Sequence, residues 1–195
     1  AVDASGNVWV TNKDSTPYTV TKINGSDGSH YGNYTTGNYP EGVAADASGN
    51  IWITNYGSDT VTKINGTSGA TIGTYSAGSG PYGVAADASG NMWVAISGSN
   101  TVIKINGTDG TIIGTYTTGV TPLGVAVDAS GNVWTANFDS NTTTKISGTD
   151  GSHYGNYTTG VEPYNIGDAT GFALQYFVLG YSLPDTTTPT INLEA

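Results

Sequence analysis

The chain offers few residues that could carry acid–base, nucleophilic or metal chemistry. Its 195 residues include two histidines, His30 and His153, but no cysteine and no arginine, and the net charge is -10. The absence of cysteine excludes thiolate nucleophiles, disulfides and thiolate metal sites. Both histidines stand in the same ten-residue segment, Gly-Ser-His-Tyr-Gly-Asn-Tyr-Thr-Thr-Gly, so they occupy one repeated position. These residues predict no catalytic site and no cofactor.

Two glutamates could supply a pair of carboxylates. Glu41 and Glu162 each stand beside a proline at the start of a new copy of a repeated segment. If the chain closes so that these segments meet, the two side chains could form an acid–base pair or a cation site. Without closure, they are two separate loop residues.

Five aspartates open a repeated turn-like segment, Asp-Ala-Ser-Gly-Asn, which is degenerate in its last copy. Each is followed by small and polar residues, as in a hairpin turn capped by its own side chain. We predict this structural role. The alternative is calcium binding, which needs about six to eight converging oxygen ligands. The candidate ligands are Asp3, Asp46, Asp87, Asp128 and Asp168.

The spacing of these aspartates shows that the chain is built from repeated segments, and the strands of each repeat position the residues discussed above. The segment recurs after 43, 41, 41 and 40 residues, and each copy continues with a Trp position, a Thr-Lys-Ile-like run, a glycine turn and Gly-x-Tyr. Each copy contains four short runs rich in β-branched and aromatic residues, separated by Gly, Asn and Asp. In the second copy these runs are 42–46, 51–55, 60–64 and 71–75. The pattern predicts a four-stranded antiparallel meander.

Sheets of this size bury their faces when copies pack radially, so we predict an all-β fold, a β-propeller with about 41 residues per repeat. The four tryptophans are expected to pack between blades. We expect five blades, the fifth incomplete, followed by a linker-like tail at 181–195; the alternative is a fragment of a six- to eight-bladed propeller. The predicted blades are 1–38, 39–79, 80–120, 121–161 and, in part, 162–180.

The loops that vary between copies are the best candidates for a binding surface. In such a meander, the loops between blades and the loops joining strands two and three lie at the same end. Their sequences change while the scaffold positions repeat, which favours ligand contacts there. The predicted contacts are Tyr39, Glu41, Tyr56, Tyr82, Phe138, Glu162 and Tyr164.

Four of the five lysines share one repeat position in the third strand of each copy. We expect each of them to pair with a carboxylate of a neighbouring blade. Such exposed pairs contribute about 0 to 1 kcal/mol each, so this is a structural role. The lysines are Lys22, Lys63, Lys104 and Lys145.

The Gly-Val-Ala-x-Asp and Ser-Gly-Asn-x-Trp-x-Thr-Asn elements resemble NHL and YVTN propeller repeats, and also the repeats of the streptogramin (virginiamycin B) lyase family. The resemblance covers residues 1 to roughly 180 and implies the propeller fold. The lyase mechanism depends on histidine and a divalent metal near the central channel. Because His30 and His153 are predicted at the start of outermost strands, no lyase site residue is transferred to this chain.

These observations favour a non-enzymatic extracellular or cell-surface propeller that serves as a binding or structural module for a protein or glycan. The scarcity of basic residues argues against nucleic acid as a partner, and no apolar run reaches the length of a membrane span. One alternative is a self-assembling surface filament, formed by strand exchange at the open edge of the incomplete blade. The other is a lyase-like or glycan-cleaving enzyme.

Overall fold

The computed structural model describes residues 1–164, and these residues form four antiparallel sheets. Every sheet is a meander in which neighbours in sequence are neighbours in space. The first sheet comprises β1 (Val8–Asn12), β2 (Thr19–Ile23) and β3 (His30–Thr35). The second comprises β4 (Pro40–Ala45), β5 (Asn50–Asn55), β6 (Thr60–Asn65) and β7 (Thr71–Ser76), with a short 3-10 turn, η1 (Tyr56–Ser58), after β5.

The third and fourth sheets repeat this arrangement without the 3-10 turn. The third comprises β8 (Pro81–Ala86), β9 (Met92–Ile96), β10 (Thr101–Ile105) and β11 (Ile112–Thr117). The fourth comprises β12 (Pro122–Val127), β13 (Asn132–Asn137), β14 (Thr142–Ser147) and β15 (His153–Thr158). The four runs predicted for the second copy match β4 to β7 within two residues at each end.

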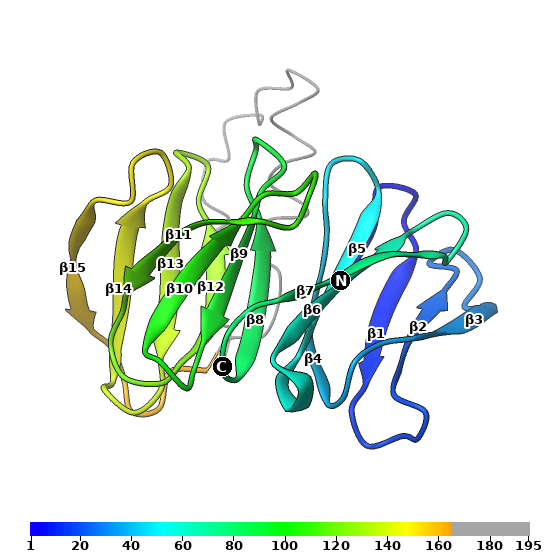
Figure 1. The fold of residues 1–195 in the computed structure, drawn as a ribbon, viewed down its shortest axis with the longest axis horizontal. Helices are drawn as coiled ribbons and strands as arrows, with labels where there is room; N and C mark the ends of the chain where they lie inside the picture. The colour runs from blue at the N-terminus through cyan, green and yellow to red at the C-terminus, as the bar shows by residue number, and fades with distance from the viewer. Residues whose placement is uncertain (165–195) are drawn as a thin grey trace, which may run out of the picture.

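The sheets stand side by side in chain order, from the first to the fourth (Figure 1). Their inner strands β4, β8 and β12 are neighbours, and β1 packs on β4. In the first sheet, Val2 bridges to Val8 and supplies the beginning of an inner strand. The arrangement confirms an all-β propeller of antiparallel blades, and its described part is an open row, not a closed ring. The predicted fifth blade beyond Tyr164 and the tail at 181–195 lie outside the described residues.

The core lies between blades, as the repeat predicts. Trp9, Trp52 and Trp93 are completely buried or nearly so, whereas Trp134 is only partly buried. The first three rings are covered by the following blade, and no further sheet follows the fourth among residues 1–164. Glycine allows the inner strands to approach, because a Cβ on Gly42 would lie 2.4 Å from the carbonyl oxygen of Tyr82.

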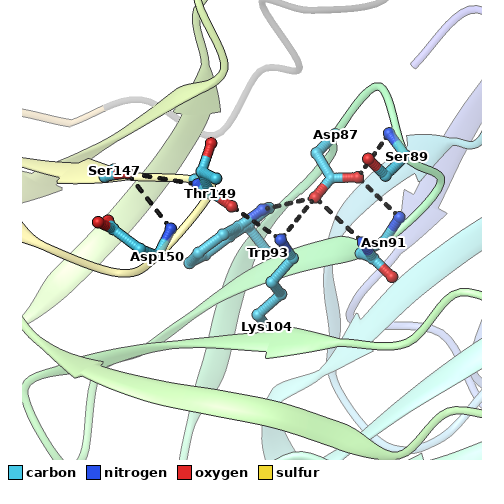
Figure 2. Close-up of polar contacts among 9 residues, drawn as sticks. Asp87, Ser89, Asn91, Trp93, Lys104, Ser147, Thr149 and Asp150 are labelled. Carbon is cyan, nitrogen blue, oxygen red and sulfur yellow. Dashed lines mark hydrogen bonds and ion pairs between the residues drawn. The ribbon is translucent and has the colours of Figure 1, made fainter.

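The repeated aspartate organises each blade from within, as Figure 2 shows for the third sheet. Asp87 Oδ1 accepts the backbone N–H groups of Ser89 and Asn91, and its Oδ2 accepts the indole N–H of Trp93 at 3.2 Å. The other three described copies make the same indole bond at 2.9 Å. This confirms the turn role predicted for these aspartates, each of which uses its oxygens within its own blade.

The repeated lysines correct one expectation. Lys22, Lys63 and Lys104 do not pair with a carboxylate of the next blade but donate to a backbone carbonyl there. Their Nζ atoms lie 2.7, 2.6 and 2.8 Å from the carbonyl oxygens of Gly66, Gly107 and Gly148, respectively. Each side chain crosses the tryptophan ring of its own blade, which directs the ammonium to the neighbouring turn. The only carboxylate partner of the three is Asp87 of the same blade, 3.2 Å from Lys104, within the described residues.

Candidate binding site at the variable loops

The two sets of variable loops lie together at one end of the sheets. Backbone hydrogen bonds join them in three successive blades, from the N–H groups of Tyr56, Ser97 and Phe138 to the carbonyl oxygens of Tyr39, Gly80 and Thr121, at 2.9, 3.0 and 2.9 Å. These bonds confirm that loops between blades share an end with the loops joining strands two and three. The variable positions therefore form one surface.

Four of the seven predicted contact residues form a continuous group of rings, here called the tyrosine cluster: Tyr56, Tyr82, Phe138 and Tyr164. Tyr82 lies edge-on to Tyr56 and to Tyr164, with centroids 6.0 and 6.2 Å apart, and Phe138 lies edge-on to Tyr164 at 6.2 Å. The hydroxyls of Tyr82 and Tyr164 are 2.8 Å apart and share a hydrogen bond. The folding of three blades thus brings together residues up to 108 positions apart.

The cluster combines covered and open rings. Tyr56 and Tyr164 are 45% and 52% exposed, whereas Tyr82 and Phe138 are half-buried. Burial raises the pKa of Tyr82, and its hydrogen bond with Tyr164 and the negative charge of Glu41 raise it further. The phenol of Tyr82 is therefore protonated at neutral pH, so it can donate a hydrogen bond but cannot act as a base.

A paired charge lies beside the cluster. Glu41 is nearly buried, and its Oε1 lies 2.5 Å from Nζ of Lys13, which is half exposed. The hydrogen bond to Glu41 raises the pKa of Lys13 despite partial burial, so the lysine is charged. Lys13 was not among the predicted contacts. The signal that could have found it is its place in the first copy of a variable loop, away from the position of the other four lysines.

Tyr39 and Glu162 lie outside the tyrosine cluster. The Tyr39 ring packs on Tyr18, with centroids 5.1 Å apart, and Glu162 is exposed in the last described loop, where its N–H donates to Asn141 Oδ1. Within residues 1–164, no contact joins Glu162 to Glu41. The hypothesis of a carboxylate pair therefore gains no support from the described structure.

The loops before the inner strands hold an unusual backbone conformation. Tyr39, Thr121 and Glu162 have φ values of 50°, 55° and 52°, at the position that Gly80 occupies in the third copy. Left-handed backbone costs about 1 to 2 kcal/mol for a residue with a Cβ. Such costs concentrate at functional sites, which agrees with the position of these loops around the cluster.

Neither histidine takes part in this surface. His30 and His153 begin the outer strands β3 and β15, where their Nε2 atoms lie 3.1 and 3.2 Å from Oδ1 of Asn33 and Asn156. No three Asp, Glu or His side chains gather as a metal site would require in the described part of the chain. Asp168, the fifth candidate calcium ligand, lies outside it. No helix among the described residues is long and apolar enough to cross a membrane.

The fold defines the chain as a β-propeller protein, and known structures of similar fold support this assignment. No family model matches the sequence, and no curated protein matches it either. Hydrazine synthase from Kuenenia stuttgartiensis superposes with a TM-score of 0.73 at 18% identity, over 80% of this chain and 47% of that one. A protein of unknown function from Bacteroides caccae gives 0.65 at 14% identity, over 80% and 58%.

The streptogramin lyases are also among the similar structures. A catalytically inactive virginiamycin B lyase from Staphylococcus aureus, solved with quinupristin, gives a TM-score of 0.70 at 21% identity, over 82% of this chain and 54% of that one. The chain thus resembles a streptogramin lyase in fold, as its repeats indicate. It spans about half the length of these structures.

Proposed function

We propose that this chain is a non-enzymatic binding module at the cell exterior, and that the tyrosine cluster binds a neutral glycan. The observation that carries the proposal is the hydrogen-bonded pair of Tyr82 and Tyr164. It joins rings from separate blades into one partly exposed aromatic surface beside Glu41. An exterior location is supported by the polar, arginine-free composition, in which only 10% of residues are charged.

The chemistry of the surface favours a neutral, hydroxyl-rich ligand. The faces of Tyr56 and Tyr164 carry the negative part of the ring quadrupole, which attracts the weakly positive C–H groups on one face of a sugar ring. The protonated hydroxyl of Tyr82 can donate a hydrogen bond beside these rings. The charge of Glu41, which acts on Tyr82, is offset by its ion pair with Lys13.

A panel of neutral and acidic oligosaccharides on an array, followed by calorimetry with each neutral sugar that is retained, tests the proposal. Tyr164→Ala should weaken binding at least tenfold, because it removes a ring and the hydroxyl partner of Tyr82. Tyr31→Ala is the matched control, since Tyr31 is 55% exposed on the outer strand β3. Retention of no neutral sugar, or equal loss in both variants, would contradict the proposal.

The alternative function is that of a lyase-like enzyme, and its basis is the similarity in fold to virginiamycin B lyase. It would need a general base or a metal at the variable-loop end. Between residues 1 and 164, Glu41 at that end is paired with Lys13, Tyr82 keeps its proton, and no three Asp, Glu or His side chains gather as a metal site would require. Incubation with quinupristin and a divalent cation, followed by mass spectrometry, separates the alternatives. Conversion of quinupristin would favour the enzyme.

A further inference from the structure

Consecutive blades contact each other through the same pair of interactions at all three interfaces between the four described blades. A lysine of one blade donates to a glycine carbonyl in the turn between the third and fourth strands of the next, as Lys104 does across the interface in Figure 2. A tyrosine of the same blade packs against a second glycine of that turn. A Cβ on Gly69, Gly110 or Gly151 would lie 1.8 to 2.0 Å from the ring of Tyr34, Tyr75 or Tyr116.

The fourth sheet presents the donor half of this contact with no partner among residues 1–164. Lys145 Nζ lies 5.0 Å from the Trp134 ring centroid, like its counterparts, but no described oxygen accepts its proton. Tyr157 packs on Trp134 at 5.9 Å and is 46% exposed. Lys145, Trp134 and Tyr157 are arranged as their counterparts are in the first three blades. The exposed face of the fourth blade therefore has the donor and the ring that bind a following blade elsewhere.

The first sheet presents the acceptor half. The turn of Gly25 and Gly28 corresponds to the turn that receives the lysine and the tyrosine in later blades. Gly25 is exposed, whereas its counterpart Gly66 is buried. Gly28 has the left-handed φ of its counterparts, 73° against 74° to 77°, but nothing lies within 4 Å of a Cβ built on it. The space that a tyrosine ring fills in the other blades is open here.

We propose that the fourth blade of one copy docks on the first blade of a second copy, with Lys145 donating to the carbonyl of Gly25 and Tyr157 packing on Gly28. The contact would continue an interface that the chain already makes three times, from complementary halves at the two ends of the row in Figure 1. Such a head-to-tail contact can close into a ring.

The sequence favours a second copy over the chain's own last segment as the occupant. In each of the first three blades, the tyrosine ring packs on a glycine 35 residues later, as Tyr116 packs on Gly151, and a side chain at that position would clash with the ring. The residue 35 positions after Tyr157 is Asn192, and the stretch 181–195 contains no glycine. A second copy offers what the stretch 181–195 lacks, because its turn holds Gly25 and Gly28 at the required positions.

Sedimentation velocity at increasing protein concentration tests the inference. The expected species has twice the chain mass of 19.9 kDa. Gly28→Asn should weaken association at least tenfold, because asparagine tolerates left-handed backbone and its side chain fills the space for the partner's tyrosine. Gly90→Asn is the matched control: Gly90 has a φ of 80°, and nothing lies within 4 Å of a Cβ there, even though its blade is covered on both sides.

Lys145→Met provides an independent test of the same contact. It removes the donor and keeps the apolar stem, so it should also weaken association roughly tenfold, in line with a charge-assisted hydrogen bond. A monomer at all concentrations would overturn the inference, as would a dimer that neither substitution affects, which is the behaviour expected of pairing between strand edges. Larger oligomers abolished by Gly28→Asn would support the docking face and contradict a closed ring of two copies.

This inference and the proposed function can fail separately. Gly25 and Gly28 lie in the turn between β2 and β3, at the end of the sheets opposite the variable loops, and neither Lys145 nor Tyr157 belongs to the tyrosine cluster. Sugar binding therefore tests the tyrosine cluster, and sedimentation tests the docking face.

Discussion

Trp52 donates its indole N–H to Oδ2 of Asp46 at 2.9 Å, across the turn that separates them in sequence. Both residues are buried, and the same carboxylate accepts the backbone N–H groups of Ser48 and Asn50. One side chain thus closes the turn between the first two strands and fixes the largest ring of the core. The repeat of this pair in every described blade explains why Asp and Trp share one period.

Asp46→Ala should lower the free energy of unfolding by about 2 to 4 kcal/mol, because it leaves the buried indole N–H and turn amides without an acceptor. The control is Asp109→Ala, since Asp109 accepts Thr111 N–H in an exposed turn. It should cost less than about 1 kcal/mol. Urea denaturation measures both values, and equal losses would contradict the role assigned to Asp46.

Acid should destabilise the propeller through the same turns. For Asp3 and Asp128, burial alone would raise the pKa, but hydrogen bonds from tryptophan, asparagine and serine outweigh it and lower the pKa below the ordinary 3.8. A lowered folded-state pKa gives stability that is present above 3.8 and is lost as the pH falls through the folded value. Urea midpoints should fall between about pH 5 and pH 2; a constant midpoint would oppose this.

Lys63→Met tests the contact between blades. It removes the hydrogen bond to Gly107 but keeps the stem on Trp52, and should cost about 1.5 to 3 kcal/mol of stability. Lys145→Met is the same change at the same repeat position, where no described carbonyl accepts the proton. In dilute protein its effect on unfolding should be smaller, and a larger effect would argue against the bond as a source of stability.

Gly42→Ala should be destabilising by about 1 to 3 kcal/mol, because its Cβ would meet the carbonyl oxygen of Tyr82 and force the inner strands apart. Gly160→Ala has open space around its Cβ and should change stability by less than about 0.5 kcal/mol. Thermal unfolding of the two variants checks this. Similar melting temperatures would contradict close approach of β4 and β8.

Ligand binding should not change between about pH 6 and pH 9. The pKa of Tyr82 is raised above the ordinary 10.0 and that of Lys13 above 10.5, so both groups keep their protons over this range. Binding should weaken only at higher pH, where Tyr82 loses its proton. Calorimetric titrations at several pH values test this, and a midpoint near neutrality would implicate a group other than Tyr82 and Lys13.

The scaffold could be predicted because each blade carries the same local sequence pattern, which determines its turns and strands. The Asp-Ala-Ser-Gly-Asn turns, the tryptophans and the strand limits follow from local pattern, and the period alone implies that sheets stack. The partner of Lys63 could not be predicted in this way. The side chain has no carboxylate to meet in the next blade and bonds to a backbone carbonyl, which carries no signature in the sequence.

The site was found only in part for a related reason. Variation in the loops identified Tyr56, Tyr82, Phe138 and Tyr164 as residues of one surface, but not their contacts, which depend on the angle between blades. Tyr39 lies in the same loops but packs on Tyr18. The Glu162 side chain makes no contact with the cluster among the described residues. Lys13 was overlooked because its importance comes from Glu41, 28 residues away.

We infer that the function of this protein resides at the variable-loop end and not in the repeated scaffold. Chemical-shift mapping with a neutral oligosaccharide retained on the array tests it most directly. We predict that the largest shifts fall on Tyr56, Tyr82, Phe138 and Tyr164, and that the Asp46 turn and its counterparts are unaffected. Shifts confined to the opposite end or to the outer strands would contradict the claim.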